Sequence, residues 1–491
     1  MIRNTQYGKV EGFERNGVEV YYGIPYGKYE RWTPCSDPDC FELLDCRQES
    51  PMAYQMVNNK IEGCHDCLNL DIYTQSHFKN RPVLVFIHGG NNQTSHSTEI
   101  EGDILVTKNE VVYVSINYRL GLLGFNNLPS IAHPTGNFAM LDIAKSLEWI
   151  KNNISNFGGD PNNVTVSGFS AGGRDVMAML ISPTFKGLFE KAIVYSGGMT
   201  TCSQEEAQKK IADTLSSLVL EDQVCASKEE AVQFLLSDTE ETREYLFSID
   251  EKRLIPFFAG AAIRMARFPH LYEDDVVLPK GGFDNPCIND VPVLMVTGSE
   301  EFSMFGIFDS NFQSIKDKEK STTFLLKHGG DFYRNFNTQH SALNLKGYQS
   351  NIYVCQINYG DLESSHRIVP FGSFHGIFVP MFVDKGQYYT LYDFHEKDYQ
   401  NMANCFHTYL KQFLETGTCW PAWTKENKNT LVLDGNKVEI KDVYMSNAEI
   451  IENMNRDPLN KEDKEILIHS ILNGRWFSSD LDAYYKNPSL W

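Results

Sequence analysis

The sequence predicts an α/β fold, with a central and mostly parallel sheet flanked by helices, from two patterns in its apolar residues. Short β-branched or apolar runs recur along the chain, and the central ones are apolar on both alternations, as strands covered by helices on both faces must be. Residues 137–157 place apolar side chains at every third or fourth position, which predicts an amphipathic crossover helix. The predicted strands are Val18–Tyr22, Leu68–Tyr73, Val83–Ile87, Val111–Ile116, Val164–Ser167, Ala192–Tyr195, Val293–Val296 and Ile352–Ile357.

Two further segments fall outside this alternation. Residues 203–267 are rich in Glu and Lys with helical periodicity, which predicts a helical cap inserted over about 203–290. After the last predicted strand come a helix near 402–413, a β-like pair near 430–440 and a charged amphipathic tail over about 446–491. No internal repeat or Gly/Ser linker separates these parts, so we expect residues 1–491 to form a single domain.

The overall composition excludes several classes of partner. A formal net charge of -20 argues against a nucleic-acid partner, because phosphate backbones are bound by basic patches. No run of about 18 apolar residues occurs, so we expect no membrane span. The N-terminus lacks the apolar stretch of a signal peptide, and the eleven cysteines are scattered, which predicts a cytoplasmic protein with free thiols. Nothing in the sequence indicates an oligomeric state.

The clearest chemical motif is Gly168-Phe-Ser-Ala-Gly172, which follows the strand Val164–Ser167 and precedes an apolar helix. A nucleophile at a tight strand-to-helix turn needs small residues two positions before and after it, because their backbones approach closely. The turn exposes the Ser170 hydroxyl and directs the helix N-terminus at developing negative charge. This context predicts a nucleophilic serine rather than an ordinary glycine-rich turn.

A second loop supplies candidate donors for an oxyanion. The run from Ile87 to Asn91 follows an apolar strand and is able to present backbone N–H groups, and the N–H of Ala171, next to the nucleophile, is another donor. We interpret His88 in this run as structural rather than catalytic.

A serine hydroxyl requires a histidine base that is oriented by a carboxylate, and the chain order in this kind of site is Ser, acid, His. His366 and His375 both follow the strand Ile352–Ile357, and we prefer His375 because it lies in a flexible glycine-flanked loop, whereas His366 is predicted to be solvated. The strand Val293–Val296 leads to the acid candidates Glu300 and Glu301, between which the residues alone do not decide.

With these motifs in place, the sequence resembles the type-B carboxylesterases of the α/β-hydrolase superfamily, which include the cholinesterases and the bacterial para-nitrobenzyl esterases. The resemblance covers residues 6 to about 445. The matching segments are Tyr22–Tyr26, Asp66–Leu70, Val83–Gly90, Ser115–Gly121, Gly136–Asn137, Phe157–Val166, Gly168–Gly173 and Lys186–Phe189.

The resemblance assigns roles to individual residues. Ser170 matches the nucleophile, His375 matches the histidine of the family's His-Gly motif, and Glu301 matches the acid because Ser303 and Phe305 follow it as in the family. The oxyanion-hole positions fall on Gly90, Asn91 and Ala171. The family mechanism forms an acyl-enzyme and uses no metal or organic cofactor.

The sequence departs from the family at two pairs of positions. Phe169 and Phe378 stand where the family usually has two neighbouring glutamates, so we expect them to form an apolar part of the substrate pocket and activity to persist at lower pH. Asn91 and Phe302 stand where the family has glycines. Asn tolerates left-handed backbone angles better than most residues, so its N–H is expected to keep its direction.

These observations predict a serine carboxylesterase that hydrolyses small-molecule carboxylic esters. One alternative is a non-catalytic binding protein on the same scaffold, against which the intact Ser, Glu and His argue. Another is an esterase specialised for phenolic or acyl-sugar esters. Choline esters are not expected, because no Trp falls between Trp32 and Trp149 to form an aromatic cation site.

Overall fold

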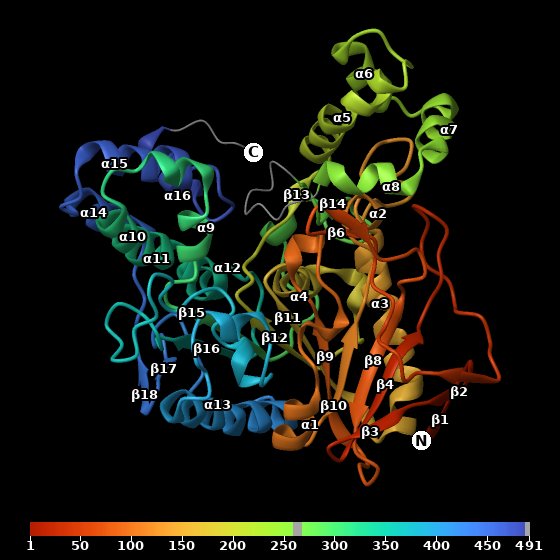
Figure 1. Ribbon diagram of the computed structural model, residues 1–491, viewed down its shortest axis with the longest axis horizontal. Helices are drawn as coiled ribbons and strands as arrows, with labels where there is room; N and C mark the ends of the chain where they lie inside the picture. Colours follow the sequence, from red (N-terminus) through yellow and green to blue (C-terminus); the bar gives the residue numbers. More distant parts are fainter. Residues whose placement is uncertain (259–267, 487–491) are drawn as a thin grey trace. The chain divides into compact units, whose positions relative to one another are not determined.

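The structure is a computed structural model that describes residues 1–258 and 268–486. Its chain divides into two compact units. Unit 1 comprises Met1–Lys191, Thr200–Asp290 and Lys346–Tyr348, and unit 2 comprises Ala192–Met199, Val291–Leu345 and Gln349–Trp491. Each unit carries strands of a mixed sheet and the helices that cover them (Figure 1).

The strands of unit 1 follow the order β11-β9-β10-β8-β4-β3. The first three pair in parallel, and the other three add antiparallel neighbours toward the edge. Nearly every residue of the parallel strands is buried except at the start of β11, as expected for strands covered on both faces. Their bounds are β3 (Phe13–Arg15), β4 (Val18–Pro25), β8 (Asn69–Thr74), β9 (Arg81–Ile87), β10 (Val112–Ile116) and β11 (Gly159–Phe169).

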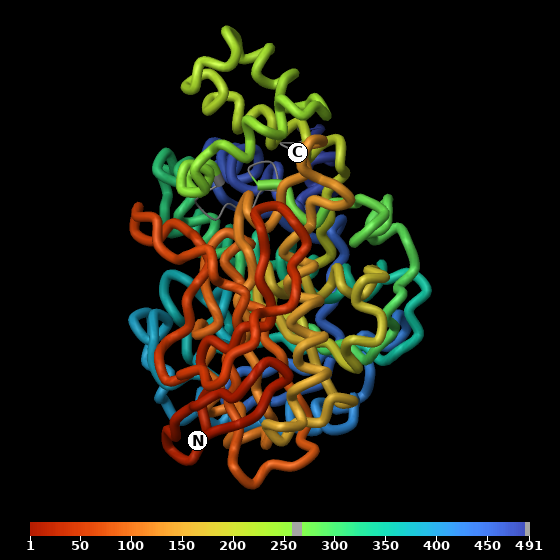
Figure 2. Tube along the Cα trace, turned by 90° about the vertical axis from the view of Figure 1, so that its right-hand side faces the viewer, coloured from red at the N-terminus to blue at the C-terminus, as the bar shows by residue number. Residues whose placement is uncertain are grey.

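The helices of unit 1 fall into two groups. Helices α1 (Asp103–Asn109), α2 (Gly121–Gly124), α3 (Phe138–Asn153) and α4 (Ala171–Ile181) connect the strands, and α3 and α4 both pack against β11. The second group lies together at one end of unit 1 in both views (Figure 1 and Figure 2). It consists of α5 (Gln204–Glu221), α6 (Lys228–Leu235), α7 (Glu240–Ser248) and α8 (Glu251–Leu254).

Short strands complete unit 1 outside its main sheet. They form a three-stranded sheet and two two-stranded ones. Their bounds are β1 (Ile2–Thr5), β2 (Gly8–Glu11), β5 (Leu43–Asp45), β6 (Gln55–Val57), β7 (Lys60–Glu62), β13 (Cys202–Ser203) and β14 (Tyr272–Glu273).

The strands of unit 2 follow the order β18-β17-β16-β15-β12, parallel except for the β17–β18 hairpin. Their bounds are β12 (Lys191–Tyr195, whose first residue belongs to unit 1), β15 (Val293–Gly298), β16 (Ile352–Ile357), β17 (Thr430–Asp434) and β18 (Lys437–Lys441). The longest helix of this unit, α13, buries one face that includes Met402, Phe406 and Phe413.

The remaining helices of unit 2 come from two separate stretches of its sequence, residues 303–344 and 447–485. In this second stretch, α14 contacts both α11 and α16, and Figure 1 shows these helices in one region of unit 2. The bounds are α9 (Ser303–Ile307), α10 (Lys318–Phe324), α11 (Gly330–Asn335), α12 (Ser341–Asn344), α13 (Lys397–Thr416), α14 (Asn447–Arg456), α15 (Lys461–Ile466) and α16 (Ser479–Tyr485).

The predicted α/β class is confirmed, and each of the eight predicted strands corresponds to an observed one. The crossover helix is α3 with a 3-10 turn over Ile154–Phe157. The segment predicted as a helical cap contains α5 to α8, part of it lies outside the described residues, and its role as a cap stays a prediction. The prediction of a single domain stays a prediction. Within residues 1–258 and 268–486, no helix combines the length and apolar character needed to cross a membrane.

Candidate active site

In unit 1, Ser170 occupies the turn between β11 and α4. Its backbone has φ 57° and ψ -113°, a sparsely populated region that costs conformational energy and is often found at nucleophiles. A Cβ on Gly168 would lie 2.2 Å from the carbonyl oxygen of Gly172, and a Cβ on Gly172 would lie 2.1 Å from that of Ile87. Glycine is therefore required on both sides of Ser170, as the sequence predicted. Since α4 begins at Ala171, the N–H groups of its first turn point toward the serine.

The loop Gly89–Asn92 packs directly against this turn. A Cβ on Gly89 would lie 3.2 Å from the Cβ of Ser170. Gly90, Asn91 and Asn92 all have left-handed backbone angles, with φ values of 78°, 56° and 57°. The loop therefore winds tightly beside the nucleophile, and the expectation that Asn91 adopts the left-handed region agrees with its φ of 56° and ψ of 29°.

Side chains from α4 hold this loop. The Arg174 guanidinium donates to Asn91 Oδ1 at 2.7 Å, and Asn92 Nδ2 donates to Asp175 Oδ1 at 2.9 Å. The Tyr118 hydroxyl also donates to Asn92, at 2.9 Å. Burial raises the pKa of Asp175 to about 7, so this carboxyl changes its protonation state close to neutral pH.

His88 has a structural environment. It is buried, stacks on Tyr118 with ring centroids 4.5 Å apart, and burial lowers its pKa to about 3. A neutral imidazole that serves as packing agrees with the interpretation from the sequence. Phe169, the last residue of β11, is also buried in unit 1.

In unit 2, the structure brings Glu301 and His375 together. Glu301 follows β15, its side chain is 0% exposed, and its Oε2 lies 3.0 Å from Nδ1 of His375. When Nδ1 donates to the carboxylate, Nε2 is the nitrogen that accepts a proton. The His375 side chain is 11% exposed, between the rings of Phe305 and Tyr333 at 5.1 and 5.9 Å.

Three further groups hold the Glu301 carboxylate. Its Oε1 accepts hydrogen bonds from the Gly298 N–H at 2.6 Å and from the Ser196 hydroxyl at 2.5 Å, and Asn337 lies 3.4 Å from Oε2. Sequence reasoning missed Ser196 and Asn337. Ser196 directly follows β12, and a polar residue at the carboxyl end of a parallel strand is the signal that could have identified it.

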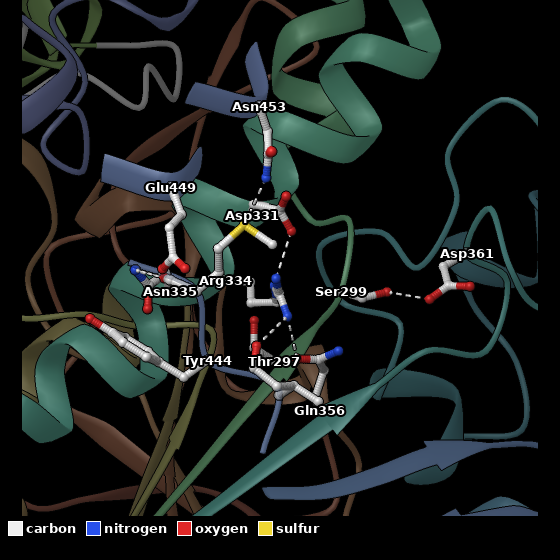
Figure 3. Close-up of polar contacts among 12 residues, drawn as sticks. Thr297, Ser299, Asp331, Arg334, Asn335, Gln356, Asp361, Tyr444, Glu449 and Asn453 are labelled. Carbon is white, nitrogen blue, oxygen red and sulfur yellow. Dashed lines mark hydrogen bonds and ion pairs between the residues drawn. The ribbon is translucent and has the colours of Figure 1, made fainter. Parts of the chain in front are cut away.

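Glu300 points elsewhere. Its N–H donates to Ser373 O at 3.1 Å and its Oε1 accepts from the Leu362 N–H at 3.1 Å. Burial raises the pKa of Glu300 to about 8, with Asp361 adding to the effect. Asp361 itself accepts from the Ser299 hydroxyl at 2.9 Å (Figure 3). Glu300 therefore braces the loop that carries His375 and does not contact the imidazole.

The turn after the acid is filled by Phe302. Its ring is buried against Phe477 at 5.3 Å and Tyr333 at 6.5 Å. A Cβ on Gly329 would lie 2.4 Å from Cδ1 of Phe302, so a glycine opposite makes room for the ring. Phe302 has φ -72° and ψ -14°, an ordinary right-handed conformation that needs no glycine.

Two other candidates complete the description of unit 2. Phe378 is buried and stacks on Tyr195 at 4.3 Å. The prediction that His366 is solvated is wrong, because its side chain is only 24% exposed, stacks on Tyr359 at 4.9 Å and lies 3.0 Å from Asp398. His366 thus fastens its loop to the start of α13.

Comparisons with known proteins extend this picture. The family model described as "Carboxylesterase family" matches residues 1–324. A para-nitrobenzyl esterase of Bacillus subtilis (strain 168) is 33% identical over 342 residues, which are 66% of this chain and 68% of that protein. An acylcarnitine hydrolase of Rattus norvegicus is 36% identical over 224 residues, 40% of each chain.

Solved structures agree over a longer span. One titled PNB esterase superposes with a TM-score of 0.68 and 25% identity, covering 89% of this chain and 97% of that one. A thermophilic PNB esterase, with a TM-score of 0.69 and 24% identity over 91% of this chain and 99% of that one, shows the same fold. These likenesses span both units, whereas the family model ends before His375.

Proposed function

The chain belongs to the carboxylesterase family and is a carboxylic ester hydrolase, and we propose that it acts through an acyl-enzyme with Ser170, His375 and Glu301 as its catalytic triad. The family match includes Ser170 and Glu301 and ends at residue 324. The observation that carries the proposal is therefore the 3.0 Å contact between His375 and the buried Glu301 carboxylate. A histidine fixed in this way has the tautomer that a serine nucleophile requires.

In the proposed mechanism, Ser170 Oγ attacks the ester carbonyl carbon while His375 accepts the hydroxyl proton. The N–H groups of Gly90, Asn91 and Ala171 stabilise the oxyanion of the tetrahedral intermediate. The intermediate then expels the alcohol, which takes the proton from the imidazolium, and the acyl group remains on Ser170. A water molecule, deprotonated by His375, repeats the sequence and releases the acid. Glu301 stabilises the imidazolium in both halves of the reaction.

The proposed substrates are small carboxylic esters. The relatives reported above are named for different esters, a para-nitrobenzyl ester and acylcarnitines, and these names support a proposal that is not restricted to one acyl or alcohol group. We propose that Phe169 and Phe378, both buried and apolar, favour uncharged groups next to the ester. We further propose a cytoplasmic location, because all eleven cysteines are free thiols, as in a reducing compartment.

Hydrolysis of para-nitrophenyl acetate and butyrate tests the proposal. Wild type is expected to turn over both esters, and Ser170→Ala to lower the rate at least about 10³-fold. Glu301→Gln is expected to retain the fold and lower kcat by about 10²-fold to 10⁴-fold, whereas the matched variant Glu300→Gln, one residue away, retains kcat within about threefold. If Ser170→Ala hydrolyses the esters as fast as wild type, the proposed mechanism is wrong.

A further inference from the structure

Asn91 occupies a backbone conformation that ordinarily favours glycine. Its φ of 56° and ψ of 29° lie in the left-handed region, and it is only 8% exposed. For residues with a Cβ this region is less stable than the right-handed one, although Asn pays a smaller penalty than most residues. A contact that holds the Asn91 side chain would offset this backbone penalty. If Asn91 left the left-handed region, the peptide groups on either side of it would turn, and its N–H would change direction.

Arg174 supplies such a contact. Its guanidinium donates to Asn91 Oδ1 at 2.7 Å, the short distance typical of a hydrogen bond assisted by charge. Arg174 is only 3% exposed, so water competes little for this hydrogen bond. Its charge also acts on its neighbours, because it contributes to lowering the pKa of buried His270 and opposes the rise at Asp175.

The position of Arg174 connects this contact to the nucleophile. Arg174 lies in the first turn of α4, and its N–H donates to the carbonyl oxygen of Ser170 at 3.0 Å. One helical turn therefore separates the serine from the side chain that holds Asn91. The next residue of α4, Asp175, bonds Asn92, which is also left-handed, so two successive residues of the helix hold two successive residues of the loop.

We propose that Arg174 is a positioning residue for ester hydrolysis: its bond to Asn91 keeps the loop in the left-handed conformation in which the N–H of Asn91 faces the oxyanion. This inference rests on the proposed function of the site. In effect, the Arg174–Asn91 pair takes over the task that a glycine performs in the family that the sequence resembles. Small displacements of a donor cost much of its effect on the rate, so the pair is expected to act on the chemical step.

A double-mutant cycle between Arg174→Met and Asn91→Gly tests the pair. With para-nitrophenyl butyrate, Arg174→Met is expected to lower kcat by about 10-fold to 10²-fold and to change KM by less than about threefold. In the Asn91→Gly background, the same change is expected to lower kcat by less than about threefold, because glycine adopts the left-handed region without a partner. Arg174→Lys, which retains a charged donor, is expected to recover part of the rate.

A transition-state analogue separates positioning from general support of the fold. The affinity of an aryl trifluoromethyl ketone, which forms a tetrahedral adduct with the serine, should fall in parallel with kcat/KM in Arg174→Met. Asp175→Asn is the matched control on the same helix turn, and its effect should be the same with Asn or Gly at position 91. If Arg174→Met does not fold, Asn91→Ala takes its place in the test. Its kcat is expected to be at least about fivefold lower than that of Asn91→Gly, because alanine has no acceptor for Arg174 and lacks the backbone freedom of glycine.

The outcomes distinguish this inference from the proposed function. Equal effects of Arg174→Met in both backgrounds, an effect on KM alone, or equal rates for Asn91→Ala and Asn91→Gly would overturn the positioning role while wild type remains an active esterase. If wild type hydrolyses no faster than Ser170→Ala, the proposed function fails and the positioning role fails with it.

Discussion

Asn91 in unit 1 and Phe302 in unit 2 both stand where the sequence resemblance places a glycine, and their surroundings accommodate the larger residue in different ways. At Asn91 the difficulty is conformational, because the backbone is left-handed, and a polar contact with Arg174 holds it. At Phe302 the backbone is ordinary and the difficulty is volume, which Gly329 and Phe477 resolve by packing. The same kind of substitution thus calls for a hydrogen bond in one place and for space in the other.

The largest expected effect is the loss of stability when the buried Phe302 ring is removed. Phe302→Ala removes a fully buried ring and is expected to lower the free energy of unfolding by about 3–5 kcal/mol. Urea denaturation followed by tryptophan fluorescence measures the change. Phe308→Ala is the matched control, since Phe308 is 68% exposed and its loss should cost no more than about 0.5 kcal/mol. Similar losses for the two variants would show that Phe302 does not support this turn.

The partner glycine gives a smaller effect of the same kind. Gly329→Ala places a Cβ 2.4 Å from the Phe302 ring and is expected to cost about 1–3 kcal/mol of stability by overpacking. Phe302→Leu replaces the ring with a smaller side chain. In that background, Gly329→Ala should lower the free energy of unfolding by less than it does in the wild type. Strict additivity in a thermal denaturation series would contradict the direct competition for space.

Each of the two regions has a buried carboxyl nearby, Glu300 or Asp175, whose pKa is raised. Such a group makes the protein less stable as pH rises, whereas a carboxyl with a lowered pKa makes it less stable as pH falls. The pKa of Glu300 is raised to about 8, so between pH 4.5 and 8 it is protonated in the folded state and ionised in the unfolded state. The folded state then binds the extra proton, and the free energy of unfolding falls as pH rises, by up to about 1.4 kcal/mol per unit. Glu300→Gln should remove the Glu300 share of this slope, which is the larger share above pH 7, measured as urea stability at pH 5, 6.5 and 8.

Asp175 should show the same sign over a narrower range. Its pKa is raised to about 7, so its contribution to stability is complete below pH 3.8 and is lost as pH rises to 7. Asp175→Asn is expected to flatten that part of the stability curve and to leave the range from pH 7 to 8, where Glu300 still titrates, unchanged. In the double variant that combines Asp175→Asn with Glu300→Gln, the slope below pH 7 should disappear, and a slope that persists there would mean that other groups dominate the pH dependence of stability.

The parts of the fold that depend on local patterns could be predicted from the sequence. Buried strands, the crossover helix and the turn at Ser170 follow from apolar periodicity and from two glycines at fixed distances. The contacts that hold Asn91 and Phe302 could not, because Arg174 and Phe477 are 83 and 175 positions away along the chain and their direction depends on packing. His366 was misjudged for the same reason, since its partners Tyr359 and Asp398 meet it only in the folded unit.

Covalent labelling with a fluorophosphonate tests the central claim most directly. Attack by an activated serine forms a phosphorus–oxygen bond and releases fluoride, and the adduct is read by intact mass and peptide mapping. The account predicts one adduct per chain, on Ser170, that is lost in Ser170→Ala and strongly slowed in His375→Ala, while His366→Ala labels like wild type. A wild-type chain that takes no label, or that is labelled on another residue, would contradict it.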